Sequence, residues 1–127
     1  MTALVLDAGA LIAIDRNDRA MAARLYAALE NGFDLRTHPM VVAQVWRDPH
    51  GRQANLARLL HAVDVVPLDD RLGRAAGLLC ADTDTNDPID AAIVLIAEPG
   101  DRVLTSDRDD ISSLLDATGT EARVVAI

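Results

Sequence analysis

The segment TNDPIDAAIVLIAE, Thr85 to Glu98, decides how the chain is interpreted, because it begins a strongly apolar helix with two carboxylates. Asp87 followed by Pro88 has the residue types of an N-cap and a first helical residue, and Asp90 then falls at the third helical position. At these positions both carboxylates can accept hydrogen bonds from free backbone N–H groups. Helix capping is therefore one sufficient explanation for the pair.

Two further aspartates follow short apolar segments of the kind that form buried strands. Asp7 comes after ALVL, and Asp107 comes after RVLTS. The carboxyl ends of parallel strands border the crevice in which ligands bind, so right-handed crossovers would bring both aspartates to one edge. Several carboxylates in one crevice need a cation to stay ionised, and their oxygens suit Mg²⁺ or Mn²⁺. We therefore predict a divalent metal site with Asp7, Asp87, Asp90 and Asp107 as ligands.

Each of these acids also has a purely structural explanation. Asp7 can accept N–H bonds in the turn that follows it, and Asp107, Asp109 and Asp110 can complement the positive end of a helix macrodipole. No single aspartate is specific for a metal. The prediction depends on their order along the chain.

Short apolar strands alternate with helical patterns along the whole sequence. We expect strands at residues 3–6, 33–37, 63–67, 102–105 and 123–127. We expect helices at residues 10–14, 19–31, 40–47, 53–61, 70–81, 88–98 and 107–116. Strands that alternate with helices predict a parallel sheet covered by helices, and no linker interrupts the pattern. Residues 1–127 are therefore expected to form a single α/β domain, with residues 63–67 as a short or edge strand because of Asp64 and Pro67.

Charge limits the classes of function. The 127-residue chain has a formal net charge of −8, and all twelve of its basic residues are arginines. An acidic chain suits broad, nonspecific nucleic-acid binding poorly, because that binding depends on phosphate neutralisation by basic groups. A metal-dependent nuclease is compatible with this charge, since a bound cation reverses the sign where a phosphate would sit.

Cysteine content and apolar run lengths set further limits. Cys80 is alone, which excludes a disulfide framework and a cysteine-based zinc site. Asp7 interrupts the first apolar run, so we expect no signal peptide, and the longest run, Ala91 to Ala97, is too short to span a membrane. We therefore expect a cytoplasmic protein without a membrane segment.

The absence of lysine argues against two classes that share a small doubly wound fold and an acidic strand end. Response-regulator receivers and phospho-aspartyl phosphatases each normally require a lysine to neutralise the phosphoryl group. The phosphatase would also need an acid two residues after Asp7, where Gly9 stands. Both classes are therefore disfavoured.

Three segments resemble the acidic motifs of PIN-domain nucleases, in particular VapC-type toxins of toxin–antitoxin pairs. They are LVLDAGALIAI at residues 4–14, DAAIVLIA at residues 90–97 and VLTSDRDDI at residues 103–111. The resemblance implies a three-layer α/β/α fold with a five-stranded parallel sheet and Mg²⁺- or Mn²⁺-dependent cleavage of RNA. It also implies a homodimer and inhibition by a cognate antitoxin protein. It assigns Asp7, Asp90 and Asp107 to catalysis, with Thr105 and Ser106 available to orient ligands or water.

The sequence departs from the family at the second motif, where VVAQVWRD places Gln44 at the position of the usual glutamate. A neutral amide oxygen can bind a metal or orient water, but it cannot act as a base. Asp48, four residues later, would share a helical face with Gln44 if the helix continued. The alternative function is a PIN-fold module that binds RNA or protein with weak or no catalysis.

The remaining basic and histidine residues carry weaker predictions. Arg16, Arg19 and Arg24 form a modest basic cluster, interpreted as a solvated helix face, with RNA contact as the alternative. His38, His50 and His61 lack metal-ligand spacing and are interpreted as solvated or capping groups. None of these residues enters the predicted site.

Overall fold

The computed structural model describes residues 2–127 and contains a five-stranded sheet in which all neighbouring strands are parallel. The strand order is β3-β2-β1-β4-β5. The strands are β1 (Ala3–Leu6), β2 (Asp34–Thr37), β3 (Val63–Val65), β4 (Arg102–Thr105) and β5 (Arg123–Ala126). The prediction of an α/β fold with a five-stranded parallel sheet is confirmed, and so is the placement of β3 at an edge.

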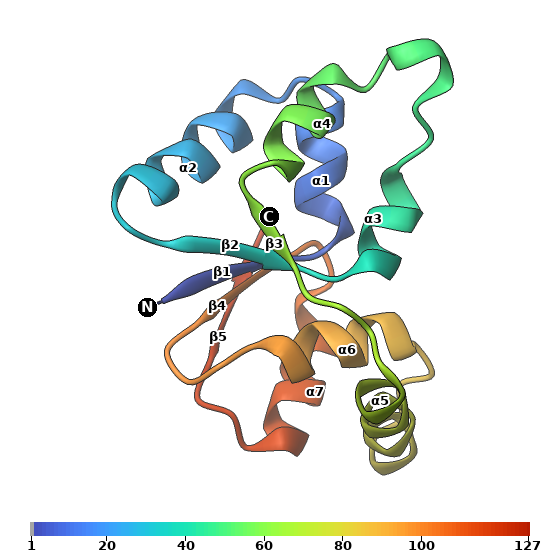
Figure 1. Ribbon diagram of the computed structural model, residues 1–127. Coiled ribbons are helices and arrows are strands. Elements are labelled where there is room, and N and C mark those ends of the chain that lie inside the picture. Colours follow the sequence, from blue (N-terminus) through green and yellow to red (C-terminus); the bar gives the residue numbers. More distant parts are fainter. Residues whose placement is uncertain (1) are drawn as a thin grey trace.

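Helices cover both faces of this sheet. Within residues 2–127 they are α1 (Ala8–Asp15), α2 (Arg19–Glu30), α3 (Pro39–Val45), α4 (Ala54–Leu60), α5 (Asp70–Asp82), α6 (Pro88–Ile96) and α7 (Arg108–Thr118), with one 3₁₀ helix, η1 (Pro49–Gly51). Figure 1 shows α1 to α4 on one side of the sheet and α5 to α7 on the other. The expected three-layer α/β/α arrangement is therefore confirmed.

The topological switch of the sheet lies between β1 and β4. The chain leaves β1 toward β2 on one side and later returns to β4 on the other, with Leu4 paired to Arg102 and Leu6 paired to Leu104. Connections that leave two neighbouring strands in opposite directions open a crevice at their carboxyl ends. Residues that follow β1 and β4 therefore border one crevice, as the sequence predicted for Asp7 and Asp107.

The core is aliphatic, as expected from a chain with three aromatic residues. Val5, Leu6, Ile93 and Val94 are completely buried, because β1 is central in the sheet and α6 packs between β1 and the helices α5 and α7. A helix that is covered on nearly all sides needs apolar residues all round, which explains the sequence of α6 after Asp90. Within residues 2–127 no helix is both long and apolar enough to cross a lipid bilayer.

In the described part of the chain, aspartates occupy the N-cap positions of five α-helices, namely Asp7, Asp18, Asp69, Asp87 and Asp107. Asp18, Asp69 and Asp87 are the N-caps of α2, α5 and α6, and each side chain accepts a hydrogen bond from a backbone N–H of the first turn. Such caps satisfy donors that have no partner inside the helix. The capping function predicted for Asp87 is confirmed.

The helix predicted at residues 40–47 ends earlier than expected. α3 stops at Val45, because the side chain of the buried Gln53 accepts hydrogen bonds from the N–H groups of Arg47 and Asp48 and donates one to the carbonyl of Val45. Asp48 adopts a left-handed backbone conformation with φ of 38° before η1. The helix therefore does not continue to Asp48, and the condition under which Asp48 would share a helical face with Gln44 is not met.

A buried ion pair between Asp101 and Arg36 connects neighbouring strands at the amino-terminal edge of the sheet. Asp101 is 1% exposed and accepts hydrogen bonds from the N–H groups of Ala3 at 2.9 Å and Glu98 at 2.8 Å, and from the Arg36 guanidinium at 2.7 Å. Arg36 also donates to the carbonyl of Ile96 at 3.1 Å. Asp101 thus fixes β1, β2 and the end of α6, a structural function that the sequence did not reveal.

Candidate metal centre

Asp7 and Thr105 form the buried base of the site at the ends of β1 and β4. One oxygen of the Asp7 carboxylate accepts the N–H of Ala8 at 2.6 Å, and the other accepts the Thr105 hydroxyl at 2.7 Å. The Thr105 hydroxyl in turn accepts the N–H of Asp107 at 2.9 Å. Because this hydroxyl donates in one direction and accepts in the other, it fixes both the Asp7 carboxylate and the start of α7.

Asp87 and Asp90 enter the site from the first turn of α6. Asp87 accepts hydrogen bonds from the N–H groups of Ile89 at 2.9 Å and Asp90 at 3.3 Å, so one of its oxygens is used for capping. Asp90 as a whole residue is 8% exposed, and no described residue donates a hydrogen bond to its carboxylate. Ionisation of a largely buried carboxylate that has no donor from the protein is disfavoured, and a cation would offset that cost.

Asp107 and Asp110 complete the cluster from the start of α7. Asp107 occupies the N-cap position, but its side chain makes no capping hydrogen bond. Oxygens of Asp90, Asp107 and Asp110 all lie within 4.8 Å of one another. From the sequence alone, Asp110 is interpreted only as a charge that complements the helix macrodipole. Its spacing of three residues from Asp107 is the signal that could have placed both side chains on one helical face.

Burial and the negative charge of neighbouring carboxylates both disfavour ionisation in this cluster. Burial, together with the charges of Asp7, Asp87, Asp107 and Asp110, raises the pKa of Asp90 from 3.8 to about 7. A hydrogen bond with Asp107, and then its charge, raises the pKa of Asp110. Of the four acids predicted as ligands, Asp90 and Asp107 have oxygens within 4.8 Å of each other and of Asp110, whereas Asp7 and Asp87 contribute charge that raises the pKa of Asp90.

The donor set fits a hard divalent cation. Carboxylate oxygens are preferred by Mg²⁺ and Mn²⁺, whereas zinc sites usually include histidine or cysteine. Asp90, Asp107 and Asp110 could hold such an ion directly, and each Asp7 oxygen keeps a lone pair beyond its existing hydrogen bond.

Comparison of the chain with protein-family models, curated proteins and solved structures finds no match. The likeness of three acidic segments to PIN-domain motifs therefore stays a prediction from sequence. What the site can do follows from the placement and charge of its own side chains.

His38 supports the site from α3. It is completely buried, its Nδ1 accepts the N–H of Met40 at 3.2 Å, and its Nε2 therefore carries the proton donated to the carbonyl of Ile89 at 2.9 Å. Burial lowers the pKa of His38, opposed by the Ile89 hydrogen bond and the charges of Asp7 and Asp87. The capping interpretation of His38 is confirmed, and the solvated one is wrong, because the ring joins α3 to the first turn of α6.

Gln44 is exposed on α3, and no described residue hydrogen-bonds its side chain. Its amide is neutral, so the side chain carries no negative charge.

We expect Mg²⁺ or Mn²⁺ to raise the thermal unfolding midpoint strongly at pH 8 and weakly at pH 5. Asp90, with a pKa of about 7, is ionised at the higher pH and protonated at the lower, and only the ionised carboxylate binds a cation well. Stabilisation of about 2.7 kcal/mol is expected when the cation concentration is a hundredfold above its Kd.

Differential scanning calorimetry with the cation and with EDTA measures this effect. Asp107→Asn should lose most of the shift, whereas Asp64→Asn, an exposed acid on β3, should retain it. An equal shift at both pH values, or in both variants, would contradict a cation at the cluster.

Proposed function

We propose that this chain is a Mg²⁺- or Mn²⁺-dependent endoribonuclease, the toxin component of a type II toxin–antitoxin system. The observation that carries the proposal is the convergence of the Asp90, Asp107 and Asp110 oxygens beside Asp7 at the carboxyl edge of the sheet. The RNA substrate and the antitoxin come from the sequence resemblance to VapC-type toxins, and the cytoplasmic location is the expectation from the sequence.

In this proposal some side chains of the site bind the cation, and others hold those side chains in position. When bound, a divalent cation supplies an acidified water and offsets negative charge on a phosphate. Asp90, Asp107 and Asp110 would hold it, while Thr105 keeps Asp7 oriented by its hydrogen bond. Without a cation the cluster repels phosphate, so we expect RNA cleavage to stop when the metal is removed.

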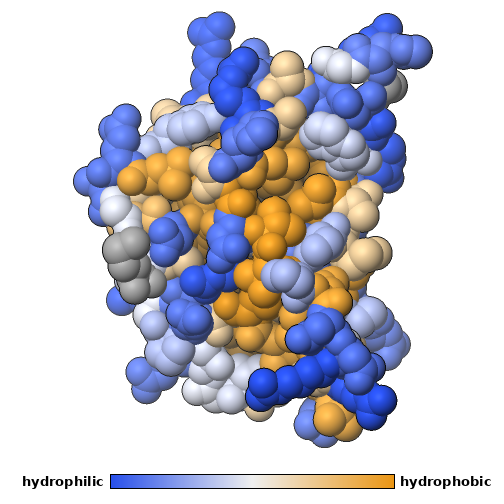
Figure 2. Space-filling view, in the orientation of Figure 1, coloured by the Kyte–Doolittle hydropathy of each residue, from blue (hydrophilic) through white to orange (hydrophobic). Residues whose placement is uncertain are grey.

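Two partners belong to the proposal. An arginine of a cognate antitoxin placed against the cluster would compete with the cation through charge-assisted hydrogen bonds. A homodimer could use the apolar area in the middle of the face seen in Figure 2, where Figure 1 places the edge strand β3. Val65 of this strand is 36% exposed, and exposed apolar areas and strand edges favour association with another chain.

The alternative is a PIN-fold module that binds RNA or protein without efficient catalysis. It is favoured by one observation, the neutral amide of Gln44 where the resembling family has an acid. The module would keep the same cluster and bind a cation without cutting RNA.

RNA cleavage assays distinguish the two functions. With Mn²⁺ or Mg²⁺ and a varied set of structured RNAs, we expect Asp7→Asn to lower the cleavage rate at least a hundredfold, equivalent to about 3 kcal/mol of barrier. Asp7 is expected to matter because it adds charge to the cluster and is fixed by Thr105.

The matched control is Asp70→Asn, an exposed acid on α5, which should cleave like the unmodified chain. Cleavage that Asp7→Asn leaves unchanged would refute the assignment of the site. Measurable metal binding with no cleavage, or cleavage that appears only in Gln44→Glu, would support the binding module.

A further inference from the structure

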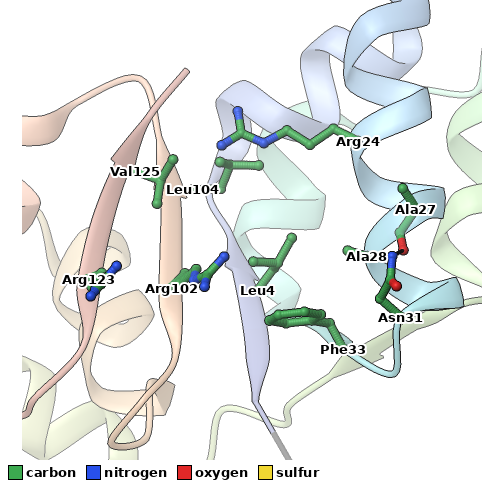
Figure 3. Close-up of a pocket in the computed structure, with 10 residues that line it drawn as sticks. All are labelled: Leu4, Arg24, Ala27, Ala28, Asn31, Phe33, Arg102, Leu104, Arg123 and Val125. Atoms are coloured by element: carbon green, nitrogen blue, oxygen red, sulfur yellow. Dashed lines mark hydrogen bonds between the residues drawn. The ribbon is translucent and has the colours of Figure 1, made fainter.

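A cavity separate from the acidic cluster lies on the face of the sheet next to α2. This cavity of about 560 Å³ has an apolar floor from three neighbouring strands, made by Leu4, Leu104 and Val125. Figure 3 shows Phe33 and the side of α2 forming one wall, with β4 and β5 opposite. None of the acidic residues of the metal centre lines this cavity.

Three arginines from three different elements line the cavity, and no carboxylate does. In Figure 3 the Arg24 side chain reaches from α2 toward the strands, while Arg102 and Arg123 stand on β4 and β5. Within residues 2–127, none of the three has a carboxylate within salt-bridge distance. The cavity is therefore a local concentration of positive charge in a chain whose net charge is −8.

Arg102 is held in place without being neutralised. Its guanidinium lies over the Phe33 ring, 5.4 Å from the ring centroid. A cation–π contact fixes the direction of a guanidinium but leaves its N–H donors available for an anion. This contact lowers the entropy cost of placing Arg102 against a ligand.

We propose that this cavity binds backbone phosphates of an RNA strand that also reaches the acidic cluster. RNA as the ligand rests on the proposed function. Affinity for RNA comes largely from neutralised phosphates, and the cluster repels them, so a nuclease of this charge needs a basic surface elsewhere. A guanidinium group can donate two parallel hydrogen bonds to the oxygens of one phosphate. Three arginines that have no salt bridge to a carboxylate of the described residues are therefore suited to such a surface.

The fold places the cavity and the cluster along the same strand. Arg102 begins β4, and Asp107 follows its end. Five residues of extended chain span roughly 17 Å, a distance that a short single strand of RNA can bridge. An acidic peptide is the other polyanion that the arginines could attract, and the experiment below separates it from RNA.

The decisive experiment compares two triple variants that remove the same charge. We expect Arg24→Gln/Arg102→Gln/Arg123→Gln to bind a fluorescently labelled single-stranded RNA of mixed sequence at least tenfold more weakly. The slope of log affinity against log salt should fall by about 2, since each lost phosphate contact contributes about 0.7. Fluorescence anisotropy in EDTA measures binding without cleavage, and circular dichroism checks that the variants fold.

The matched control is Arg16→Gln/Arg19→Gln/Arg58→Gln, three exposed arginines outside the cavity, which should stay within about threefold of the unmodified chain. Equal losses in both triples, or no measurable RNA binding by the unmodified chain, would overturn the proposal. It would also be overturned if a labelled glutamate-rich peptide, and not RNA, depended on the cavity arginines. RNA binding that depends on them in a chain that never cleaves RNA would refute the nuclease while keeping this site.

Discussion

Replacement of Asp90 by asparagine is expected to stabilise the fold by about 2–4 kcal/mol at pH 8 in EDTA. In the same protein it should abolish metal-dependent cleavage, with a rate loss of at least about a hundredfold. The pKa of Asp90 is raised to about 7 in the folded chain, so the folded state binds this proton more tightly than the unfolded state does. Ionised Asp90 therefore destabilises the fold above pH 7, and asparagine removes that cost.

The sign of this effect depends on pH in a defined way. Stability that Asp90 contributes in its protonated form is fully present below its ordinary pKa of 3.8 and is lost as the pH rises through about 7. Urea denaturation should therefore show a large gain for Asp90→Asn at pH 8 and almost none at pH 4. A variant that is less stable than the unmodified chain at pH 8 would show that ionised Asp90 does not carry the cost of burial and of neighbouring charge described above.

Replacement of Asp101 by asparagine is expected to lower the free energy of unfolding by about 3–5 kcal/mol. Asp101 is 1% exposed and accepts hydrogen bonds from the backbone at Ala3 and Glu98 as well as from Arg36. Asparagine leaves the Arg36 charge without its buried partner and turns an –NH₂ group toward other donors.

An exposed ion pair in the same chain provides the control for Asp101. Arg74 and Asp70 lie 2.9 Å apart on α5, but their side chains are 79% and 81% exposed. Asp70→Asn should cost no more than about 1 kcal/mol, because water already solvates both charges. Similar urea midpoints for the two variants would show that the buried Asp101–Arg36 pair contributes no more to the free energy of unfolding than the exposed pair does.

Local sequence patterns were sufficient to predict most of the strands and helices of the fold. The apolar run ALVL and the segment RVLT became β1 and β4 with the expected bounds, since a central parallel strand needs apolar residues on both faces. The end of α3 was missed because it depends on Gln53, a residue outside the helix whose side chain satisfies the backbone after Val45. Nothing in the sequence of the helix itself contains that information.

The candidate site was predictable in outline and not in detail. Strand ends and a helix start located Asp7, Asp90 and Asp107, because parallel topology makes those positions converge. Three acids begin α7, and only the three-dimensional arrangement shows that Asp110, rather than Asp109, lies beside Asp90 and Asp107. The arginine cavity was not predictable either, since Arg24, Arg102 and Arg123 come from three different elements. The sequence grouped Arg24 with Arg16 and Arg19, but of these three only Arg24 lines the cavity.

A divalent cation at the acidic cluster is the central claim, and anomalous diffraction from crystals soaked in Mn²⁺ tests it most directly. We predict an anomalous peak within coordination distance of the Asp90, Asp107 and Asp110 carboxylates, lost in crystals of Asp107→Asn. Clustered carboxylates without a peak at saturating Mn²⁺ and pH 8 would contradict the claim.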